Sequence, residues 1–489
     1  MIWECAKCGR SSQRPLTKCN FCGAELTRRE DHAWTVKGFT EVFVPSPGHE
    51  AVPYFIVMLE SELGERRLRK TFVRRELGET FDLSPESETD GRSVVAMSRV
   101  GYVALDAVSR CLDMIGPHAF GPDTRVLLKP NLVFEMAAAT GVVTNPQVIE
   151  GVLLYLLERG VPAEQITVGD GAAIGFDTMR AARKSGTEAL CKLYGVQFID
   201  LNASEYVDRE PANVEDGIVY KIAREVMEHD LIINIPVVKT HFQVGLSCSL
   251  KNMKGVLAAE TRKRMHRRDI HTRIAELNSI LPPYLSVADA TIGLEGMGPS
   301  VLGTPAHFGL VLASRDPVAL DATVCRLFHW PIPRYVSLAA QMGVGFENPE
   351  KIAVTGEEVK VVEGKRELPD KEFSPHPSVH VIDGSGCSGC SNTIWLALQD
   401  LTKRLDYTEA KISVLFGTGG ADAARATEHP LVCIGACALH LGAQAADIVK
   451  GCPPDKKQIT EVMFRRLLDL KRAAPVRSTD RTQEGYDNV

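Results

Sequence analysis

Cysteines near the C-terminal end of this chain are grouped in three short phrases, and this grouping constrains the fold more than any other feature. A pair two residues apart, Cys387-Ser388-Gly389-Cys390, is followed by Gly435-Ala436-Cys437-Ala438 and then by Gly451-Cys452-Pro453-Pro454. A thiolate pair followed by single cysteines beside small residues is typical of loops that surround an iron–sulfur cluster. The small neighbours let the backbone approach the cluster and donate N–H groups to its sulfides. We therefore expect an iron–sulfur cluster in this part of the chain.

These phrases resemble the proximal 4Fe–4S site shared by the nickel–iron hydrogenase small subunit and the corresponding subunit of respiratory complex I. The resemblance implies a flavodoxin-like α/β domain with one 4Fe–4S cluster, a partner subunit beside it, and the ligands Cys387, Cys390, Cys437 and Cys452. It leaves Cys433 outside the ligand set, and no cysteine follows Cys452 to hold a further cluster. A zinc site and plain buried thiols are the alternatives. Zinc sites usually pair two short Cys-x-x-Cys hooks, so the pattern favours the cluster.

A second set of cysteines lies at the N-terminus and forms two Cys-x-x-Cys hooks, each followed by a glycine: Cys5, Cys8, Cys19 and Cys22. The glycines permit the tight turn that lets two thiolates point at one ion. This pattern predicts a zinc ribbon over residues 1–30 with one structural Zn²⁺. A rubredoxin-like iron site is the chemical alternative.

Length and charge limit the classes of protein that the chain can belong to. A chain of 489 residues is too long for a single core, and its net charge of −6 with scattered basic residues argues against a nucleic-acid partner. No apolar run reaches the roughly 18 residues that a membrane helix needs, and no signal peptide precedes the predicted ribbon. Cysteines in metal-ligand patterns favour a reducing compartment over disulfides. We therefore expect a cytoplasmic protein without a membrane partner, suited to anaerobic conditions.

Short strands separated by turns are predicted after the ribbon, at residues 34–36, 39–44, 54–59 and 71–73. A zinc ribbon followed by several short strands is typical of a small barrel, so we expect an OB-like β-barrel over residues 31–90. Together with the two cysteine hooks, Pro15 and the Pro53-Tyr54 phrase, this segment resembles the zinc-ribbon and OB-fold family catalogued as domain of unknown function 35. Members of that family accompany thiolases and related acyl-CoA enzymes, so the resemblance implies contact with acyl-CoA or with such an enzyme. A barrel that serves only for docking is the alternative.

Strands alternate with helices after a polar linker at residues 81–92. Buried strands are predicted at 126–128, 165–168, 231–235 and 310–313, and an amphipathic helix at 146–158. This alternation predicts a doubly wound parallel sheet over residues 95–365. A second α/β unit with the 4Fe–4S cluster over residues 375–475 and a disordered tail over 476–489 complete the expected multidomain α/β protein.

Polar residues follow several of these strands, at the place where doubly wound sheets bind ligands. Ammonium groups that meet there attract an anion, such as a carboxylate or an acyl-thioester substrate. The residues that we expect to bind it are Lys129, Asn131, Lys239, His241, Lys251, Asn252 and Lys254. His241 and Lys239 are the candidate catalytic groups, because His241 can exchange a proton near neutral pH. The alternative is that these lysines are simply solvated.

The same strand-end phrases, with the Gly293-x-Glu295-Gly296-x-Gly298-Pro299 loop, resemble the uncharacterised family catalogued as domain of unknown function 362 across residues 95–330. They are similar, more distantly, to the amino-terminal domain of lactate-racemase-like proteins. The resemblance implies the fold and leaves the reaction open.

Two further features of this segment have open interpretations. Five acidic residues could pair with the lysines or bind a divalent cation, or they could cap helices: Asp170, Asp289, Glu295, Asp316 and Asp321. The basic run from Arg262 to Arg268 predicts a solvated helix face or a mobile loop, with the alternative that it folds over a bound anion.

Three functions remain open at this point. The first is an iron–sulfur oxidoreductase, or its electron-transfer component, that acts on a carboxylate or acyl-CoA-type substrate held by the central domain. The second is an accessory or cofactor-assembly protein that docks to an acyl-CoA enzyme or another redox partner. The third is a redox-neutral enzyme of the racemase or isomerase type that uses His241 and Lys239.

Overall fold

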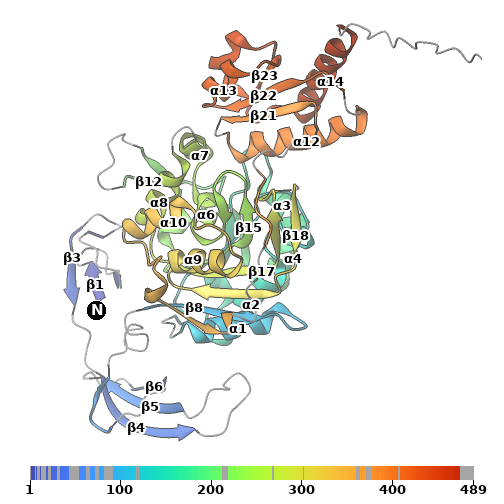
Figure 1. The fold of residues 1–489 in the computed structure, drawn as a ribbon. Helices are drawn as coiled ribbons and strands as arrows, with labels where there is room; N and C mark the ends of the chain where they lie inside the picture. The colour runs from blue at the N-terminus through green and yellow to red at the C-terminus, as the bar shows by residue number, and fades with distance from the viewer. Residues whose placement is uncertain are drawn as a thin grey trace, which may run out of the picture. The chain divides into compact units, whose positions relative to one another are not determined.

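The computed structural model describes most of the chain between residues 92 and 473 and short stretches before that. The described residues are 2–5, 7, 11–12, 18–19, 22, 24–29, 34–42, 54–61, 66–71, 76–81, 92–116, 118, 120–211, 218–266, 269–300, 302–359, 364, 366–370, 376–384, 386–405 and 408–473. The chain divides into two compact units, Met1–Asp370 and Lys371–Val489, which are described separately below (Figure 1).

Two small antiparallel sheets are formed by the N-terminal residues. The first has the strand order β2-β1-β3, with β1 (Ile2–Cys5), β2 (Ser11–Ser12) and β3 (Leu26–Arg29). The second has the order β6-β5-β4-β7, with β4 (Trp34–Val42), β5 (Tyr54–Ser61), β6 (Arg66–Thr71) and β7 (Thr80–Phe81). Val36, Val57 and Leu59 form its small core. The described pairings give an open sheet, so closure into an OB-like barrel stays a prediction.

Strand positions in the second sheet differ from the sequence prediction at two points. Strand β4 replaces two predicted strands, because a bulge between Val36 and Gly38 keeps the chain paired with β5. Strand β6 lies before the strand predicted at 71–73, most of which falls outside the described residues. Its basic sequence Arg-Arg-Leu-Arg-Lys-Thr suits the edge of a sheet, where charged side chains discourage pairing with another chain.

A large, mostly parallel sheet forms the centre of the first unit; we call this sheet, with the helices that cover it, the central unit. Its strand order is β11-β10-β9-β14-β17-β19-β8-β20, and β15, β16 and β18 pair with its members outside this path. The bounds are β8 (Ser93–Arg99), β9 (Val126–Pro130), β10 (Ile166–Asp170), β11 (Gln197–Asp200), β14 (Leu231–Ile235), β15 (Val237–His241), β16 (Gly245–Ser247), β17 (Leu285–Gly296), β18 (Gly303–Ala306), β19 (Leu310–Ser314) and β20 (Ile352–Gly356). On the main path only β19 runs antiparallel to its neighbours, so the predicted all-parallel sheet is corrected at this strand. The rest confirms a parallel-rich α/β sheet.

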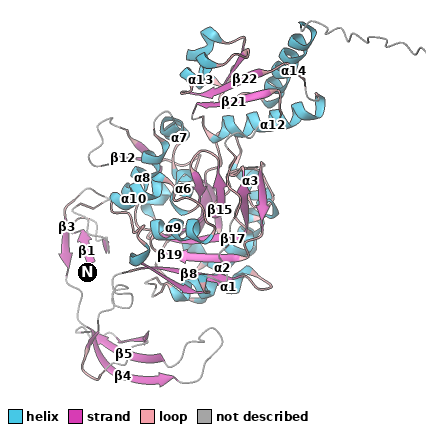
Figure 2. Cartoon of the chain, in the orientation of Figure 1, coloured by secondary structure: helices cyan, strands magenta, loops and turns pink. Residues whose placement is uncertain are grey.

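Helices cover both faces of this sheet (Figure 2). Successive residues of one strand enter opposite cores, as when Leu127 packs on one face and Leu128 on the other. One face carries α1 (Ala104–Met114), α2 (Pro146–Glu158) and α4 (Thr187–Tyr194); the other carries α6 (Ser249–Asn252), α8 (Ile270–Ile280), α9 (Pro317–Leu327) and α10 (Arg334–Gln341). Further elements are α3 (Thr178–Ser185), α5 (Arg224–Glu228), α7 (Ala259–His266), the 3-10 turns η2 (Ala138–Thr140), η3 (Ala163–Gln165), η4 (Met253–Val256) and η5 (Pro349–Lys351), and the hairpin β12 (Tyr206–Arg209) with β13 (Tyr220–Ala223). The helix predicted at 146–158 is confirmed; Asn145 caps it and Pro146 begins it.

The second unit is a smaller α/β unit with a four-stranded parallel sheet in the order β21-β22-β23-β24. Its elements are β21 (Val379–Gly384), α12 (Ser388–Arg404), β22 (Ile412–Gly417), α13 (Ala421–Ala426), β23 (Leu431–Ile434), η6 (Ala436–Gln444), β24 (Asp447–Val449) and α14 (Lys456–Ala473). Because all four strands run in one direction, the loops that follow them lie at one edge of the sheet.

Candidate functional site

Three neighbouring strands of the central sheet carry buried polar side chains at their carboxyl ends. Lys129 lies in β9, Asp170 ends β10, and Asn234 lies in β14 directly opposite Lys129. The Lys129 Nζ atom donates to Asp170 Oδ1 at 2.7 Å, and both side chains are almost completely buried. Asp170 Oδ2 accepts a second hydrogen bond from the Leu132 backbone N–H at 2.6 Å. The lysine predicted at this strand end is therefore one half of a buried ion pair.

Gly255 packs directly against this ion pair. A β-carbon at that position would lie 2.4 Å from Asp170 Oδ1 and 2.9 Å from Lys129 Nζ, so only glycine fits. The turn that carries Gly255 is thus locked onto the strand ends, and it brings the neighbouring Lys254 with it.

A chain of amide side chains connects this ion pair region to Lys239. The Lys239 Nζ atom donates to Asn131 Oδ1 and to the Val142 carbonyl, each at 2.7 Å. Asn131 Nδ2 donates to Asn252 Oδ1 at 2.8 Å, and Asn252 Nδ2 donates to Asn234 Oδ1 at 2.7 Å. Each amide is oriented by the next one. The structure thus brings together three of the predicted anion-binding residues from three segments of the chain: Asn131, Lys239 and Asn252.

Lys239 and His241 lie within a strand, which corrects the prediction that they follow one. Strand β14 ends before Pro236, but the chain stays in the sheet after this proline. It continues as β15, which pairs with β16 and β17. Lys239 is 1% exposed. Burial lowers the pKa of its amine to about 7, and the negative charges of Asp170 and Asp289 oppose this shift. The amine can therefore exchange a proton near neutral pH.

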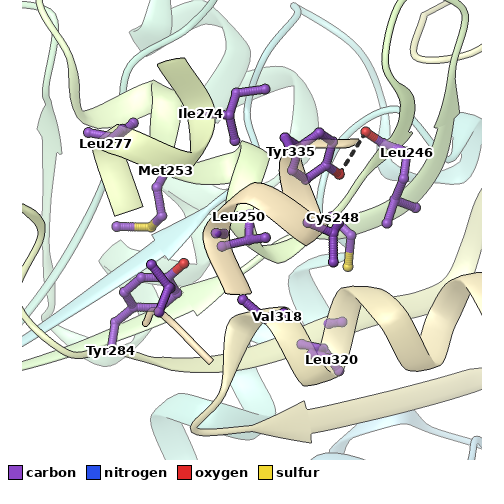
Figure 3. Packing of buried hydrophobic residues seen from close by; sticks show 14 of the residues in the cluster. Leu246, Cys248, Leu250, Met253, Ile274, Leu277, Tyr284, Val318, Leu320 and Tyr335 are labelled. Atoms are coloured by element: carbon purple, nitrogen blue, oxygen red, sulfur yellow. Dashed lines mark hydrogen bonds between the residues drawn. The ribbon is translucent and has the colours of Figure 1, made fainter. Parts of the chain in front are cut away.

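The helical segment α6–η4 presents two faces with different roles. Leu250 and Met253 point into the hydrophobic core beside Ile274, Leu277 and Tyr284 (Figure 3). Lys251 follows Leu250 and Lys254 follows Met253, each by one residue. The two lysines therefore lie one above the other on an adjacent face of the segment. Tyr335 secures the preceding segment by donating to the Leu246 carbonyl at 3.1 Å. The core thus fixes the segment, and the segment fixes both lysines.

Four basic side chains from β15, α6–η4 and α7 gather beside this segment; we call them the basic cluster: His241, Lys251, Lys254 and His266. Lys254 Nζ lies 2.9 Å from His266 Nε2. Burial holds the pKa of His241 well below its usual value, and the positive charges of Lys251, Lys254, His266 and Lys239 add to this effect. Burial and the charges of Lys254 and Lys239 likewise hold the pKa of Lys251 well below its usual value. The positive charges of Lys251 and Lys254 thus make protonation of His241 and His266 harder.

The two ring nitrogens of His241 have different environments. The Nδ1 atom accepts a hydrogen bond from the Gln243 backbone N–H at 3.2 Å. The Nε2 atom is buried and has no hydrogen-bond partner among the described residues. Because Nδ1 accepts a hydrogen bond, a neutral ring carries its proton on Nε2. His241 therefore brings to the basic cluster one N–H donor that has no acceptor among the described residues.

Helix α7 corrects the prediction of a solvated basic run at two of its residues, Arg262 and His266. Arg262 and His266 are 6% and 8% exposed, and Met265 is fully buried. Arg262 donates to the Ala172 carbonyl at 2.8 Å and to the Asn202 side chain. The buried face of α7 thus packs over the loop that follows β10. Arg262, Met265 and His266 are spaced i, i+3 and i+4, so they lie on one face of the helix, and this spacing is the signal in the sequence. The signal is weak, because arginine and histidine on such a face do not indicate burial.

The described hydrogen bonds of the other four acidic residues go to groups other than the lysines. Asp289 accepts hydrogen bonds from the Asn145 backbone and from Thr291. Asp316 caps α9, which confirms the helix-cap interpretation, and Asp321 caps α6 by accepting from the Ser249 N–H at 2.7 Å. Glu295 accepts from the Glu367 N–H. Within the described ranges, no three His, Cys, Asp or Glu side chains form a group that could hold a metal ion.

The C-terminal cysteines lie at one edge of the sheet of the second unit. Cys387 and Cys390 follow β21 and begin α12, Cys437 follows β23, and Cys452 follows β24. The Ala436 N–H donates to the Gly451 carbonyl at 2.8 Å, which joins the last two loops. The pKa of Cys390 is raised by a hydrogen bond with Cys387, by burial, and then by the charges of Cys387, Cys452 and Cys437. All four predicted ligands are therefore electrostatic neighbours.

Glycine lets the loops approach Cys390 closely. A β-carbon on Gly435, which has a φ of +91°, would lie 3.2 Å from the Cys390 sulfur. Cys433 is different, because it is fully buried in β23 and packs in the core of this unit. In a four-iron cluster each thiolate binds a different iron, so four thiols on separate loops are a suitable donor set for one. Both the cluster and the alternative of zinc stay predictions for these cysteines.

The predicted zinc ligands are only partly described. Cys5 ends β1, Cys19 is buried, and Cys22 is half-buried. Cys8 lies outside the described residues. The zinc site therefore stays a prediction. Among the described helices, none has the length and apolar character that crossing a membrane requires.

The chain is similar to a protein family, a curated protein and a solved structure. A family model described as domain of unknown function (DUF362) matches residues 126–326. The thylakoid-associated protein sll1697 of Synechocystis is 27% identical over 241 residues, which are 48% of this chain and 72% of that protein. The lactate racemase apoprotein from Thermoanaerobacterium thermosaccharolyticum aligns over 70% of this chain and 72% of its own, with 14% identity and a TM-score of 0.30. The matched range 126–326 contains the basic cluster and excludes the C-terminal cysteines.

Proposed function

We propose that this chain is an iron–sulfur redox protein whose central unit binds an organic anion of the carboxylate or acyl-thioester class. The observation that carries the proposal is the meeting of Cys387, Cys390, Cys437 and Cys452 at one edge of a parallel sheet, on loops that glycine allows to approach closely. A bound 4Fe–4S cluster would supply electron transfer at these four thiolates. The chain would then be an oxidoreductase or the electron-transfer component of one.

The central unit supports anion binding through the buried amine of Lys239. Among the described residues, Asp170 pairs with Lys129, whereas the amine of Lys239 donates to the neutral acceptors Asn131 and Val142. A buried ammonium is costly, so a carboxylate beside Lys239 would be stabilised by the protonated amine. Asn131 and Asn252 would orient that amine, because their amide chain fixes the acceptor that holds it.

Redox-neutral proton transfer is the second candidate function. It is favoured by the pKa of about 7 at Lys239, because this amine can exchange a proton near neutral pH, and by the Nε2 atom of His241, which has no hydrogen-bond partner among the described residues. In this reading His241 and Lys239 act on a substrate proton without any change in oxidation state.

One experiment distinguishes these two functions. Oxygen-free protein is incubated in D2O with a panel of 2-hydroxy and 2-oxo carboxylates and with acyl-CoA esters, with and without an artificial one-electron acceptor. The redox function predicts acceptor reduction that depends on one of these compounds. Deuterium incorporation without acceptor reduction would support the redox-neutral function instead, and neither signal would favour an accessory role.

The N-terminal segment is proposed to hold one structural Zn²⁺ on Cys5, Cys8, Cys19 and Cys22 and to dock to a protein partner such as an acyl-CoA enzyme. A closed four-thiolate zinc stabilises a small fold without taking part in chemistry.

We expect Cys19→Ser to remove zinc and to make residues 1–90 sensitive to protease, because metal binding and folding are coupled in so small a unit. Iron content should stay unchanged, since the cluster cysteines belong to the other compact unit. Zinc and iron are measured together by elemental analysis. Loss of both metals from this variant would show that the two cysteine sets are not independent.

A further inference from the structure

Asp289 in β17 anchors the loop segment 142–145, and this loop binds the amine of Lys239. The Oδ2 atom of Asp289 accepts a hydrogen bond from the Asn145 backbone N–H at 2.7 Å, at one end of the loop. At the other end, the Val142 carbonyl accepts from Lys239 Nζ at 2.7 Å. The loop therefore connects the carboxylate to the amine, and both of these side chains are buried.

Thr144 fixes the middle of the same loop. Its hydroxyl accepts from the Asn131 N–H at 2.7 Å and donates to the Ile235 carbonyl at 2.8 Å. Its own N–H donates to the Asn131 carbonyl at 3.0 Å. Asn131 presents its Oδ1 atom to the amine of Lys239. Both described acceptors of that amine are thus connected to one loop, and Asp289 anchors the loop.

The carboxylate of Asp289 is itself oriented by several donors. Besides the Asn145 N–H, it accepts from the Thr291 N–H at 2.9 Å and from the Thr291 hydroxyl at 2.6 Å. Burial raises the pKa of Asp289, and these hydrogen bonds together with the positive charge of Lys239 oppose the rise. The donors therefore favour the ionised carboxylate, whose negative charge acts on the amine.

Charged groups from several elements surround Lys239. Asp170 is the acid with the largest effect on its pKa, but Asp170 is paired with Lys129, whose positive charge acts in the opposite direction. Asp289 accepts its described hydrogen bonds from neutral groups, so a paired lysine does not offset its charge in this way. The groups that act on Lys239, or on which Lys239 acts, are Lys129 in β9, Asp170 in β10, Asp289 in β17, Cys248 before α6, Lys251 in α6 and His241 in β15.

We propose that Asp289 is a positioning residue for Lys239: it holds the loop that presents the Val142 carbonyl, and its negative charge favours the protonated amine. The inference rests on the proposed function, in which Lys239 holds a carboxylate or exchanges a substrate proton. It adds the group that sets the balance between the two forms of the amine. Burial favours the neutral amine, which attracts no anion, and Asp289 shifts the balance toward the ammonium.

Nuclear magnetic resonance of the full-length protein, labelled with ¹³C at the ε-carbon of lysine, tests the proposal. The signal of Lys239 is identified by its absence from Lys239→Met protein, and its change with pH reports the pKa of the amine. In the unmodified protein, the amine is expected to titrate at a pKa of about 7. In Asp289→Asn protein, we expect the midpoint to fall by roughly one pH unit or more, because the loss of a nearby negative charge disfavours the ammonium.

Asp316→Asn is the matched control. Asp316 is also a buried aspartate that accepts backbone hydrogen bonds, from Val318 and Ala319 at 2.9 Å each, but it caps α9 and is not among the groups that act on Lys239. Lys239 should therefore titrate in this variant as it does in the unmodified protein. A second variant, Asp289→Ser, removes the same charge with a smaller side chain, so the test does not depend on the folding of Asp289→Asn alone.

Calorimetry with acetate separates this inference from the proposed function. The unmodified protein should bind acetate near neutral pH, and Asp289→Asn should bind it about fivefold more weakly, since a midpoint lowered by about one pH unit leaves roughly a tenth of the amine protonated instead of half. Absence of acetate binding to the unmodified protein would contradict anion binding at Lys239, while the lysine titration would still decide the role of Asp289. An unchanged Lys239 midpoint in folded Asp289→Asn or Asp289→Ser protein would overturn the inference.

Discussion

Cys452→Ala protein purified without oxygen is expected to lose most of its iron and sulfide, whereas Cys433→Ala protein keeps about four of each per chain. The two residues lie in the same unit but in different environments. Cys452 is exposed in the loop after β24, beside the other three predicted ligands, and Cys433 is buried inside β23. A four-iron cluster with one ligand removed is poorly held, while a core cysteine replaced by alanine leaves every ligand in place.

Iron and acid-labile sulfide are measured chemically, and the folded state of both variants is checked by circular dichroism. Cys387→Ala, Cys390→Ala and Cys437→Ala should behave like Cys452→Ala. Iron retained in Cys452→Ala but lost in Cys433→Ala would show that the ligand assignment is wrong, even if a cluster is present.

Lys129→Met is expected to be the most destabilising single change in the central unit, by about 3–5 kcal/mol. The substitution leaves the Asp170 carboxylate buried, with the Leu132 N–H as its one remaining hydrogen-bond donor among the described residues. The cost arises because a buried charge without a partner is far less stable than the same charge in water. Thermal unfolding of the central unit should shift down by roughly 10 °C.

Lys192→Met is the matched control. Its amine lies 3.0 Å from Glu188, a separation similar to that of the buried pair, but the lysine side chain is 74% exposed. An exposed pair of this kind contributes about 0.3–0.5 kcal/mol, so the control should hardly change the unfolding midpoint. The double variant Lys129→Met/Asp170→Leu should recover part of the loss, because it removes both charges. Equal shifts in Lys129→Met and Lys192→Met would contradict the buried-pair account.

Strand-end residues were predictable because their role follows from local pattern. An apolar run such as Val126–Leu128 followed by Lys-Pro-Asn indicates a buried strand that ends at a ligand-binding edge, and the structure places Lys129 and Asn131 there. The strand that contains Lys239 and His241 was missed, because a proline normally ends a strand and Pro236 stands between β14 and β15. The sheet nevertheless continues, since β17 is long enough to pair with both.

Contacts between distant segments could not be read from spacing. The partner of Lys129 is Asp170, and the partner of Lys239 is Asn131; each pair is joined only when the sheet assembles. Burial of Arg262 and His266 was also hidden, because arginine and histidine normally mark a solvated helix face. The position of the four cysteines at one sheet edge was easier to anticipate, since strands of a parallel sheet place their following loops together.

The central claim is tested most directly by iron and acid-labile sulfide analysis of the unmodified protein, purified without oxygen, combined with electron paramagnetic resonance after reduction. The account predicts about four iron and four sulfide per chain and a paramagnetic signal that appears on reduction. Protein that carries zinc at the C-terminal cysteines, or that contains no acid-labile sulfide, would contradict it.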